Sequence, residues 1–476
     1  MKTTFPKLIV LFFSIGLYAQ TGHIMQGVGA VNMSMGGAAT AQPLDISGAM
    51  HWNPASVAAF DHKVIKFDVG LFFSSPSLSS SLPSGMLFQA GDMGPGSPES
   101  PPVFGTTEDE RGLSLMPAIA MLWAKEDSKH TFGLSAFGIS GFGVTFPQET
   151  NLPFSADGNP NMNWDPSNSN PILWPQAFRG FGRVQSDYML LQVSGTWAYE
   201  LSDKVSIGIQ PNINYAALTL EPNPLAAPDF PQLPNEIGKG YPVSDKASAI
   251  GFGAQFGIFY DSKAGIKLGA SYKTAQKFNA FEFKNTYLDG SSAPEVAFQM
   301  DYPAIVSMGI GYSINNIDLA LDFRRVLYED TEGFKASGWQ MGDNGFPTGA
   351  VQGFGWNNIS VLSVGAQYKG IHKLPLRFGY THSSNPIAEE LAFFSTPAPA
   401  IIRNAYQLGL SYELTNKWQI DAVYHYGTSD GKTQGTLLDP SAISPTNPLG
   451  KIPGTTVAYD MTTSMIMFGI QYQFLK

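Results

Sequence analysis

Gly365-Ala-Gln-Tyr368 is one of five copies of a Gly-x-x-Tyr pattern in the second half of the chain. The others are Gly257-Ile-Phe-Tyr260, Gly309-Ile-Gly-Tyr312, Gly409-Leu-Ser-Tyr412 and Gly469-Ile-Gln-Tyr472. Positions three apart in a strand point to opposite faces, so each Gly faces one side of a sheet and each Tyr the other. Tyrosines at one height on successive strands are typical of the aromatic girdle of a membrane barrel. A soluble sheet with Tyr-rich strands is the alternative.

The composition favours the membrane barrel over the soluble sheet. Only 14% of the residues are charged, compared with roughly 25% in soluble domains, yet the mean hydropathy is −0.05. After the N-terminus no apolar run approaches the ~18 residues that a transmembrane helix needs. Few charges without long apolar runs are typical of strands that face lipid on one side and a lumen on the other. The net charge of −10 argues against nucleic acid as a partner.

The N-terminal residues 1–19 have the pattern of a secretory signal peptide. Lys2 and Lys7 form the positive region, residues 8–17 form the apolar core, and cleavage is expected after Ala19. The apolar run is too short to span a bilayer. The chain has no Cys that could carry a lipid, which excludes a lipoprotein and agrees with an exported protein without disulfides.

Period-two alternation bounded by turn residues predicts fourteen strands. They span residues 63–79, 112–125, 130–146, 184–200, 204–220, 247–261, 265–284, 295–312, 317–329, 356–369, 374–386, 403–413, 417–428 and 459–474. Short polar turns alternate with longer connections rich in Pro, Gly, Ser and Asn. The even strand number and the segregated turn lengths predict an all-β fold, a 14-stranded antiparallel transmembrane β-barrel with short periplasmic turns and long extracellular loops.

The charged residues fix which face of each strand meets lipid, because a charge there costs about 2–4 kcal/mol at the bilayer midplane. Asp318, Asp322 and Arg324 on one strand, and Asp421 and His425 on another, are therefore predicted to face the lumen. The residues that alternate with them are predicted to face lipid: Leu319, Leu321, Phe323, Trp418, Ile420, Tyr424 and Tyr426.

Fourteen strands enclose more space than wall side chains can fill, so the lumen is either an open pore or plugged. Residues 20–62 precede the first strand, do not alternate, and are rich in Gly and Ala. They are predicted to form a small N-terminal plug, or hatch, in the lumen, followed by the barrel over 63–476. Within the hatch, Asn53 is placed to cap a short helix that has Pro54 at its first position.

Two motifs in the predicted hatch resemble those of a known family. Ser34-Met-Gly-Gly-Ala-Ala-Thr-Ala41 is followed, after a short spacer, by Trp52-Asn-Pro-Ala55. This arrangement, together with Gly269-Ala-Ser-Tyr-Lys-Thr274 and Leu376-Arg-Phe-Gly-Tyr380, resembles the FadL/TodX outer-membrane transporters. The hatch residues that carry the resemblance are Gly36, Gly37, Asn53, Pro54 and Ala55.

The resemblance implies passive uptake of hydrophobic small molecules, such as long-chain fatty acids or aromatic hydrocarbons, across a Gram-negative outer membrane. It implies contact with outer-membrane lipid and no cofactor, and we expect a monomer. It also implies hatch rearrangement and a lateral opening at a kink in the third strand. In this chain that strand contains Gly138-Ile-Ser-Gly-Phe-Gly143, so Gly138, Gly141 and Gly143 are the candidates for the kink. Glycines weaken a ladder and permit a bulge, although close packing against the hatch is an alternative role.

Candidate substrate-binding residues fall into two groups. An aromatic stretch in a long loop contains Trp174, Phe178 and Phe181 and is predicted to form either a capture groove for apolar substrate or a loop folded over its own core. Basic residues that face the lumen are candidates to hold a carboxylate head group by charge-assisted hydrogen bonds. They are Arg324, Arg377, Lys267 and Lys273. An ion pair within the lumen, as between Arg324 and Asp322, is the alternative.

No motif indicates catalysis or metal binding. Thr381-His-Ser-Ser384, followed by Asn385, has residue types found in hydrolase triads, but adjacent strand residues point in opposite directions. The histidines lack metal-ligand spacing. We therefore expect no catalytic residue and no metal, and we retain two alternatives to hydrophobic uptake: a general porin for small polar solutes, and an outer-membrane lipid hydrolase that uses His382.

Overall fold

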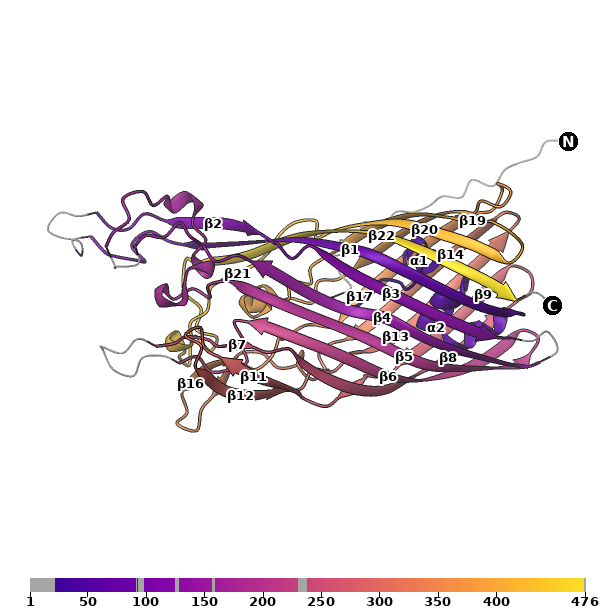
Figure 1. Ribbon diagram of the computed structural model, residues 1–476, viewed down its shortest axis with the longest axis horizontal. Coiled ribbons are helices and arrows are strands. Elements are labelled where there is room, and N and C mark those ends of the chain that lie inside the picture. The colour runs from indigo at the N-terminus through magenta and orange to yellow at the C-terminus, as the bar shows by residue number, and fades with distance from the viewer. Residues whose placement is uncertain are drawn as a thin grey trace.

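In the computed structural model, which describes residues 22–90, 92, 98–124, 128–155, 159–229 and 238–474, fourteen strands close an antiparallel barrel (Figure 1). The wall strands in order are β1 (Lys63–Leu82), β3 (Leu113–Trp123), β4 (His130–Phe146), β5 (Val184–Ser202), β6 (Val205–Glu221), β8 (Ala247–Asp261), β9 (Ile266–Lys273), β13 (Ala304–Ile314), β14 (Ile317–Leu327), β17 (Ile359–Tyr368), β18 (Leu376–Ser383), β19 (Asn404–Glu413), β20 (Trp418–Thr428) and β22 (Thr456–Phe474). β22 pairs with β1 and closes the barrel. The predicted fold class is confirmed. The predicted signal peptide, 1–19, lies outside the described residues.

Two predicted strands, 265–284 and 295–312, are wrong in extent. β9 ends at Lys273 and the next wall strand, β13, begins at Ala304. The residues between them form the two-residue β10 (Lys277–Phe278) and a hairpin of β11 (Phe281–Thr286) and β12 (Ser292–Phe298) that belongs to a separate small sheet with β7 (Val243–Ser244). β11 alternates in burial as the wall strands do, so period-two patterning alone could not separate it from the wall.

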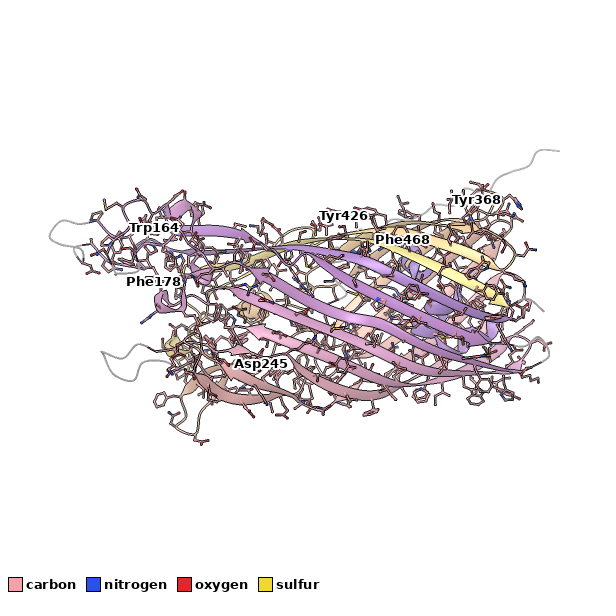
Figure 2. All side chains as sticks on the ribbon, viewed as in Figure 1. Trp164, Phe178, Asp245, Tyr368, Tyr426 and Phe468 are labelled. Carbon is pink, nitrogen blue, oxygen red and sulfur yellow. The ribbon has the colours of Figure 1, made fainter. Side chains whose placement is uncertain are left out.

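The long connections build a crown at one end of the barrel. They contain β2 (Val103–Glu108), β15 (Trp339–Met341), β16 (Pro347–Val351) and β21 (Thr433–Gly435), and the 3-10 helices η2 (Pro166–Asn168), η3 (Pro171–Leu173), η4 (Gln176–Phe178), η5 (Glu389–Ser395) and η6 (Pro440–Ala442). Figure 2 shows Trp164 and Phe178 in this crown and Tyr368 at the opposite end, where the turns are short. None of the helices in the described part of the chain is long and apolar enough to cross a bilayer.

The facing predicted from the charges is confirmed. The side chains of Asp318, Asp322, Arg324, Asp421 and His425 are at most 4% exposed. The residues predicted to face lipid are between 39% and 49% exposed: Leu319, Leu321, Phe323, Trp418, Ile420, Tyr424 and Tyr426. Three tyrosines of the Gly-x-x-Tyr pattern are exposed on the outer face, and Tyr260 and Tyr472 are half-buried. The wall is therefore apolar outside and polar inside along these strands.

The hatch lies within the barrel and contains α1 (Ala30–Ser34), α2 (Ile46–Trp52) and η1 (Pro54–Ala59) (Figure 1). Four of the five glycines of the Gly-x-x-Tyr pattern face it, whereas Gly469 faces Asp68 and Asp421 of the wall. A Cβ built on Gly365 would lie 2.6 Å from the Met35 carbonyl oxygen, and one built on Gly257 would clash with the Asn53 side chain. Because the wall has no side chain at these positions, the hatch backbone lies directly against it.

We predict that this hatch blocks ion flow. Deleting residues 20–61 should raise single-channel conductance sharply, since the lumen of a fourteen-stranded barrel is wider than its own side chains fill. Planar-bilayer recording tests this, with heat-modifiable gel mobility as the control for a folded barrel. An intact barrel with unchanged conductance would show that the hatch does not seal the lumen.

Candidate functional site

The barrel wall is interrupted between β3 and β4. Their ladder runs from Trp123↔Phe132 to Ala118↔Phe137 and ends there. β3 nevertheless stays paired with β1 as far as Leu113, and β4 stays paired with β5 as far as Phe146. We call the space between residues 113–117 and 138–143 the wall gap.

Pro117 explains where the ladder ends. The three atoms nearest to a Cβ built on Gly138 are Cδ, O and N of Pro117, at 3.5, 3.6 and 3.9 Å. The backbone N and O of Pro117 thus face β4. Because Cδ of the proline ring replaces the amide hydrogen, Pro117 cannot donate a ladder hydrogen bond to β4. β4 adds a second irregularity, since its register with β5 shifts between Gly138 and Ser140. The interruption therefore has a cause on each strand.

The N-terminal arm of the hatch, residues 22–26, satisfies the backbone groups of β4 at this interruption. Met25 N donates to Ile139 O at 3.0 Å, and Gly141 N donates to His23 O at 3.2 Å. The Ser140 hydroxyl donates to the same His23 carbonyl at 2.9 Å. The arm thus replaces β3 as the hydrogen-bonding partner of β4, from the lumen side.

The loop before β3 closes the gap at the crown end. Arg111 forms an ion pair with Asp187 at 2.5 Å and lies over Gly143, where a side chain would displace its guanidinium group. Asp109 Oδ1 accepts a hydrogen bond from Thr145 N at 2.5 Å, and burial raises the pKa of this loop carboxyl above its usual range. The opening is therefore bounded at both ends.

A cavity of about 440 Å³ passes from the lumen into the wall gap. Its lining includes lumen residues such as Met33 and Met465, which are 1% exposed, and residues on the outer face, Leu113, Leu115 and Met189, which are 47–63% exposed. Gly141 and the arm also line it. Six lining residues are methionines: Met25, Met33, Met116, Met189, Met461 and Met465. Thioether side chains are flexible and polarizable, so the cavity suits apolar molecules of varied shape.

His23 of the arm separates this cavity from the aromatic side of the lumen. Its ring is buried and stacks on Phe334, with ring centroids 4.9 Å apart. Its Nδ1 lies 3.0 Å from the Tyr328 hydroxyl, and its Nε2 has no partner among the described residues. Other rings surround it within 6.3 Å: Phe142, Tyr188, Tyr302, Tyr328 and Trp356.

The Gly-Gly motif holds the hatch to β14. Gly36 and Gly37 have φ of 67° and 76°, a conformation that favours glycine. The turn presents the amides of Ala39 and Thr40 to one oxygen of Asp322, each at 2.9 Å. Arg324 bonds the Gly37 carbonyl and Asp322, and it lies over the Trp52 ring at 3.6 Å. The guanidinium group is bound on all these sides, which favours a structural role over substrate binding.

Asn53 links the hatch to itself and to the wall. Its Oδ1 accepts a hydrogen bond from Ala55 N at 3.1 Å, at the start of η1. Its Nδ2 donates to Thr40 O at 2.8 Å and to Ile258 O of β8 at 3.0 Å. With Pro54 and Ala55 it therefore joins the two motifs of the hatch.

A cluster of buried charges holds the other side of the hatch. Lys66 of β1 pairs with Asp45 of the hatch at 2.7 Å and with Asp421 at 3.0 Å. Asp68 accepts a hydrogen bond from Ala30 N at 2.9 Å. Nearby, Arg377 donates to Gln367 and Ser411 at 2.7 and 2.8 Å. Like Arg324, Arg377 does not line the gap cavity, and neither residue lines the apolar pocket that Phe181 and Trp339 form in the crown.

A sequence model of the family described as outer membrane protein transport protein (OMPP1/FadL/TodX) matches residues 178–475. The chain belongs to this family. Among solved structures it is similar to the toluene transporter TodX of P. putida, at 14% identity and a TM-score of 0.63, covering 95% of this chain and 99% of that one. A Pseudomonas aeruginosa FadL homologue gives 14% identity, a TM-score of 0.65 and coverage of 96% and 100%. The Ralstonia pickettii toluene transporter TbuX is 17% identical, with a TM-score of 0.55, and the match covers 94% of this chain and 99% of that one. At these identities the likeness shows the fold, and no curated protein matches the chain.

Membership of this outer-membrane family orients the barrel, with the crown outside the cell and the short turns in the periplasm. In the crown, Phe181 lines an apolar pocket together with Tyr241, Trp339 and Phe393. Trp174 does not line it, because its ring is 3% exposed and its indole N–H donates to Ser169. Phe178 stacks on Phe154 of the same crown, with centroids 6.3 Å apart. Of the three predicted groove residues, the structure brings only Phe181 to this pocket.

The residues proposed for hydrolysis do not assemble. His382 is half-buried and bonds Asn404 at 2.8 Å, whereas Thr381 and Ser383 on either side of it are buried. Thr381 bonds the Gly36 carbonyl of the hatch. Among the described residues, no group of three or more His, Cys, Asp or Glu side chains could hold a metal ion.

Replacing Pro117 by valine should close the wall gap. Valine supplies the missing amide hydrogen and suits a strand, and each added hydrogen bond contributes about 1 kcal/mol. Uptake of a radiolabelled apolar probe into vesicles should fall. The matched control is Pro211→Val on β6, a lipid-facing position within a continuous ladder to β8. Unchanged uptake by a Pro117 variant whose structure shows a closed gap would contradict a role for the gap in passage.

Replacing Asn53 by alanine should loosen the hatch without unfolding the barrel. Losing the cap costs typically ~1 kcal/mol, and two further hydrogen bonds are lost. We expect faster proteolysis of the hatch and a larger ion leak, with Asn53→Ser less affected because it keeps an acceptor for Ala55 N. Loss of probe binding with normal hatch protection would instead indicate that Asn53 contacts substrate.

Proposed function

We propose that the chain is a passive channel for uptake of hydrophobic molecules and that they leave it sideways, through the wall gap into the membrane. The observation that carries this proposal is the continuity of one cavity from buried lumen residues to side chains exposed on the outer face of the barrel. The ligands in the names of the toluene transporters TodX and TbuX agree with a hydrophobic substrate.

The first step is capture at the crown. The pocket beside Phe181 is apolar and lies among the crown residues, but its volume of about 20 Å³ has room for about one water molecule, so capture requires the surrounding side chains to move apart. A water-exposed molecule gains about 25 cal/mol for each Å² of apolar surface that it buries there. The affinity of such a pocket concentrates the substrate at the entrance, and concentration then drives its entry into the gap cavity.

The second step is movement of the arm. Residues 27–58 are tied to the wall by buried charges and by amides that bind Asp68 and Asp322. The arm has hydrogen bonds to Ile139, Ser140 and Gly141, further bonds to Tyr328 and Gln407, and the packing of its buried His23 ring, but no ion pair among the described residues. A substrate can therefore displace the arm while the rest of the hatch keeps the periplasmic end closed.

The two alternative functions are less well supported by this geometry. A porin for polar solutes needs a water-filled passage, whereas the hatch fills the lumen against inward glycines. A lipid hydrolase needs a serine-type nucleophile beside its base, whereas His382 Nδ1 lies beside Asn404 and the Tyr380 phenol, and the hydroxyls of Thr381 and Ser383 point to the other face. Conductance of the intact protein and hydrolysis of a lipid ester measure these alternatives directly.

Filling the wall gap should reduce hydrophobic uptake. A Cβ on Gly141 would meet only Tyr188 O at 3.1 Å and Met116 Cε at 3.9 Å, so an indole in Gly141→Trp would extend into the cavity. The matched control is Gly195→Trp on the neighbouring β5, where the nearest atom is the lipid-facing Leu134 side chain. Uptake of an apolar probe by proteoliposomes should fall for the first variant and persist for the second. Full uptake by a folded Gly141→Trp protein would refute the lateral exit.

A further inference from the structure

The side chain of Arg111 crosses the outer face of β4 at the crown end of the wall gap. Its partner Asp187 faces outward from β5, because Ser186 and Tyr188 on either side of it are buried. Gly143 lies opposite Asp187 in the ladder between β4 and β5, and residues opposite each other in a ladder share a face. Arg111 therefore reaches Asp187 by passing over Gly143 on the outside of the barrel.

The absence of a side chain at Gly143 gives Arg111 its place. A Cβ built on Gly143 would collide with the guanidinium group, so any larger residue would displace it. The guanidinium group in turn fills the space in front of Gly143, whereas the cavity is open in front of Gly141. The three glycines of β4 thus have different surroundings: Gly138 faces Pro117, Gly141 faces the cavity, and Gly143 lies under Arg111.

The loop that carries Arg111 is fixed, but the side chain itself is held by one partner. Glu110 N donates to Thr145 O at 2.9 Å, and Thr145 N donates to Asp109, so the loop backbone is bonded to β4. Among the described residues, the Arg111 side chain has Asp187 as its one ion-pair partner, and the two side chains are 19% and 48% exposed. An ion pair that reaches solvent contributes little to stability, so the side chain can leave Asp187 while the loop stays in place.

The ion pair lies at a level of the membrane where it can open. Trp197 is exposed on the same face of β5 as Asp187, ten residues nearer the short turns. At about 3.4 Å per residue and a strand tilt of roughly 35–45°, the two positions are separated by roughly 24–28 Å along the bilayer normal. The apolar band of such a barrel has about this height, so Asp187 stands at its extracellular edge. A charged pair can separate there without entering hydrocarbon.

We propose that Arg111 and Asp187 set the breadth of the molecules that leave through the wall gap. With the pair closed, the exit is the stretch beside Gly141, which passes slim molecules. With the pair open, the exit extends to Gly143 and passes broad, rigid molecules as well. Arg111, Gly143 and Asp187 all line the gap cavity. The inference rests on the proposed function and adds to it a pair of residues that determines specificity.

The test compares two hydrocarbons with the same number of carbon atoms, the broad, rigid pyrene and the slim hexadecane. Both are radiolabelled, delivered from cyclodextrin and taken up by proteoliposomes that contain the full-length protein. Arg111→Ala should raise the uptake rate of pyrene up to about fivefold, the factor that corresponds to opening an exposed ion pair, and leave hexadecane within about twofold. Asp187→Asn should also raise pyrene uptake, because it releases Arg111. Arg111→Lys can still pair with Asp187 and should resemble the wild type.

A reversible lock tests the closed state within one folded preparation. The chain has no Cys, so Arg111→Cys combined with Asp187→Cys can be joined selectively by a short bis-methanethiosulfonate linker. The linked protein should lose pyrene uptake and keep hexadecane uptake, and dithiothreitol should restore the uptake of pyrene. Because the linked and reduced samples are the same protein, the comparison does not depend on how a single variant folds.

Arg183→Ala is the matched control. Arg183 forms an exposed ion pair with Glu221 next to β5 and does not line the gap cavity. Removing this guanidinium group should leave the ratio of pyrene to hexadecane uptake unchanged. The control separates the loss of the pair over Gly143 from the general effect of removing a surface charge at the crown end of the barrel.

The outcomes separate this inference from the proposed function. An unchanged ratio of pyrene to hexadecane uptake in Arg111→Ala and in the linked protein refutes the role of the pair and leaves the uptake function intact. Uptake of neither hydrocarbon above that of protein-free liposomes refutes the proposed function, and the role of the pair with it. A higher ratio in Arg111→Ala and Asp187→Asn, together with a reversible loss of pyrene uptake in the linked protein, establishes that the pair selects by breadth.

Discussion

The backbone hydrogen bonds that β4 cannot make with β3 determine how the rest of the molecule is arranged. In a membrane every backbone N–H and C=O needs a partner within the protein, since lipid offers none. Pro117 removes a donor from the ladder, and between Gly138 and Gly143 β4 has no neighbouring strand on that side of the wall. The hatch arm supplies it through the backbone of His23 and Met25. The interruption of the wall and the arm inside the lumen therefore depend on each other, because the arm supplies the hydrogen bonds that the interruption leaves unmade.

The same arrangement divides the hatch into a fixed part, held by buried charges, and the arm, which we propose is movable. The fixed part is held by groups that are costly to separate, such as Lys66 with Asp45, because breaking a buried pair leaves an uncompensated charge. The arm, which we propose moves, is held by hydrogen bonds of about 1 kcal/mol each and by the packing of the His23 ring, without an ion pair among the described residues. In the proposed mechanism, substrate binding displaces the arm and leaves the ion-paired part in place, so that the barrel passes a molecule without losing its seal.

The sequence predicted the wall well and the site only in part. Charges such as Asp322 and Asp421 fixed the facing of their strands, since only one face tolerates a charge. The predicted strands 265–284 and 295–312 include parts of β11 and β12, because the sequence before and after the hairpin's turn continues the alternation of the wall strands. Pro117 was missed, although a proline within a predicted strand is a signal in itself. The structural use of Arg324 and the pairing of Arg111 with Asp187 depend on which residues the fold brings together, and one sequence does not contain that information.

A lateral exit agrees with the energetics of an apolar substrate. Passage straight through the hatch would carry the molecule among the buried charges of Lys66, Asp68 and Asp421 and then into water. Each methylene that enters water costs about 0.8 kcal/mol, so this exit would become slower with every added carbon. Passage between β3 and β4 keeps the apolar substrate in contact with Leu113, Leu115 and Met189 and then with lipid. In the proposed lateral exit the polar fixed hatch makes the axial route unfavourable, and the apolar gap provides a route along which the hydrophobic effect does not oppose release.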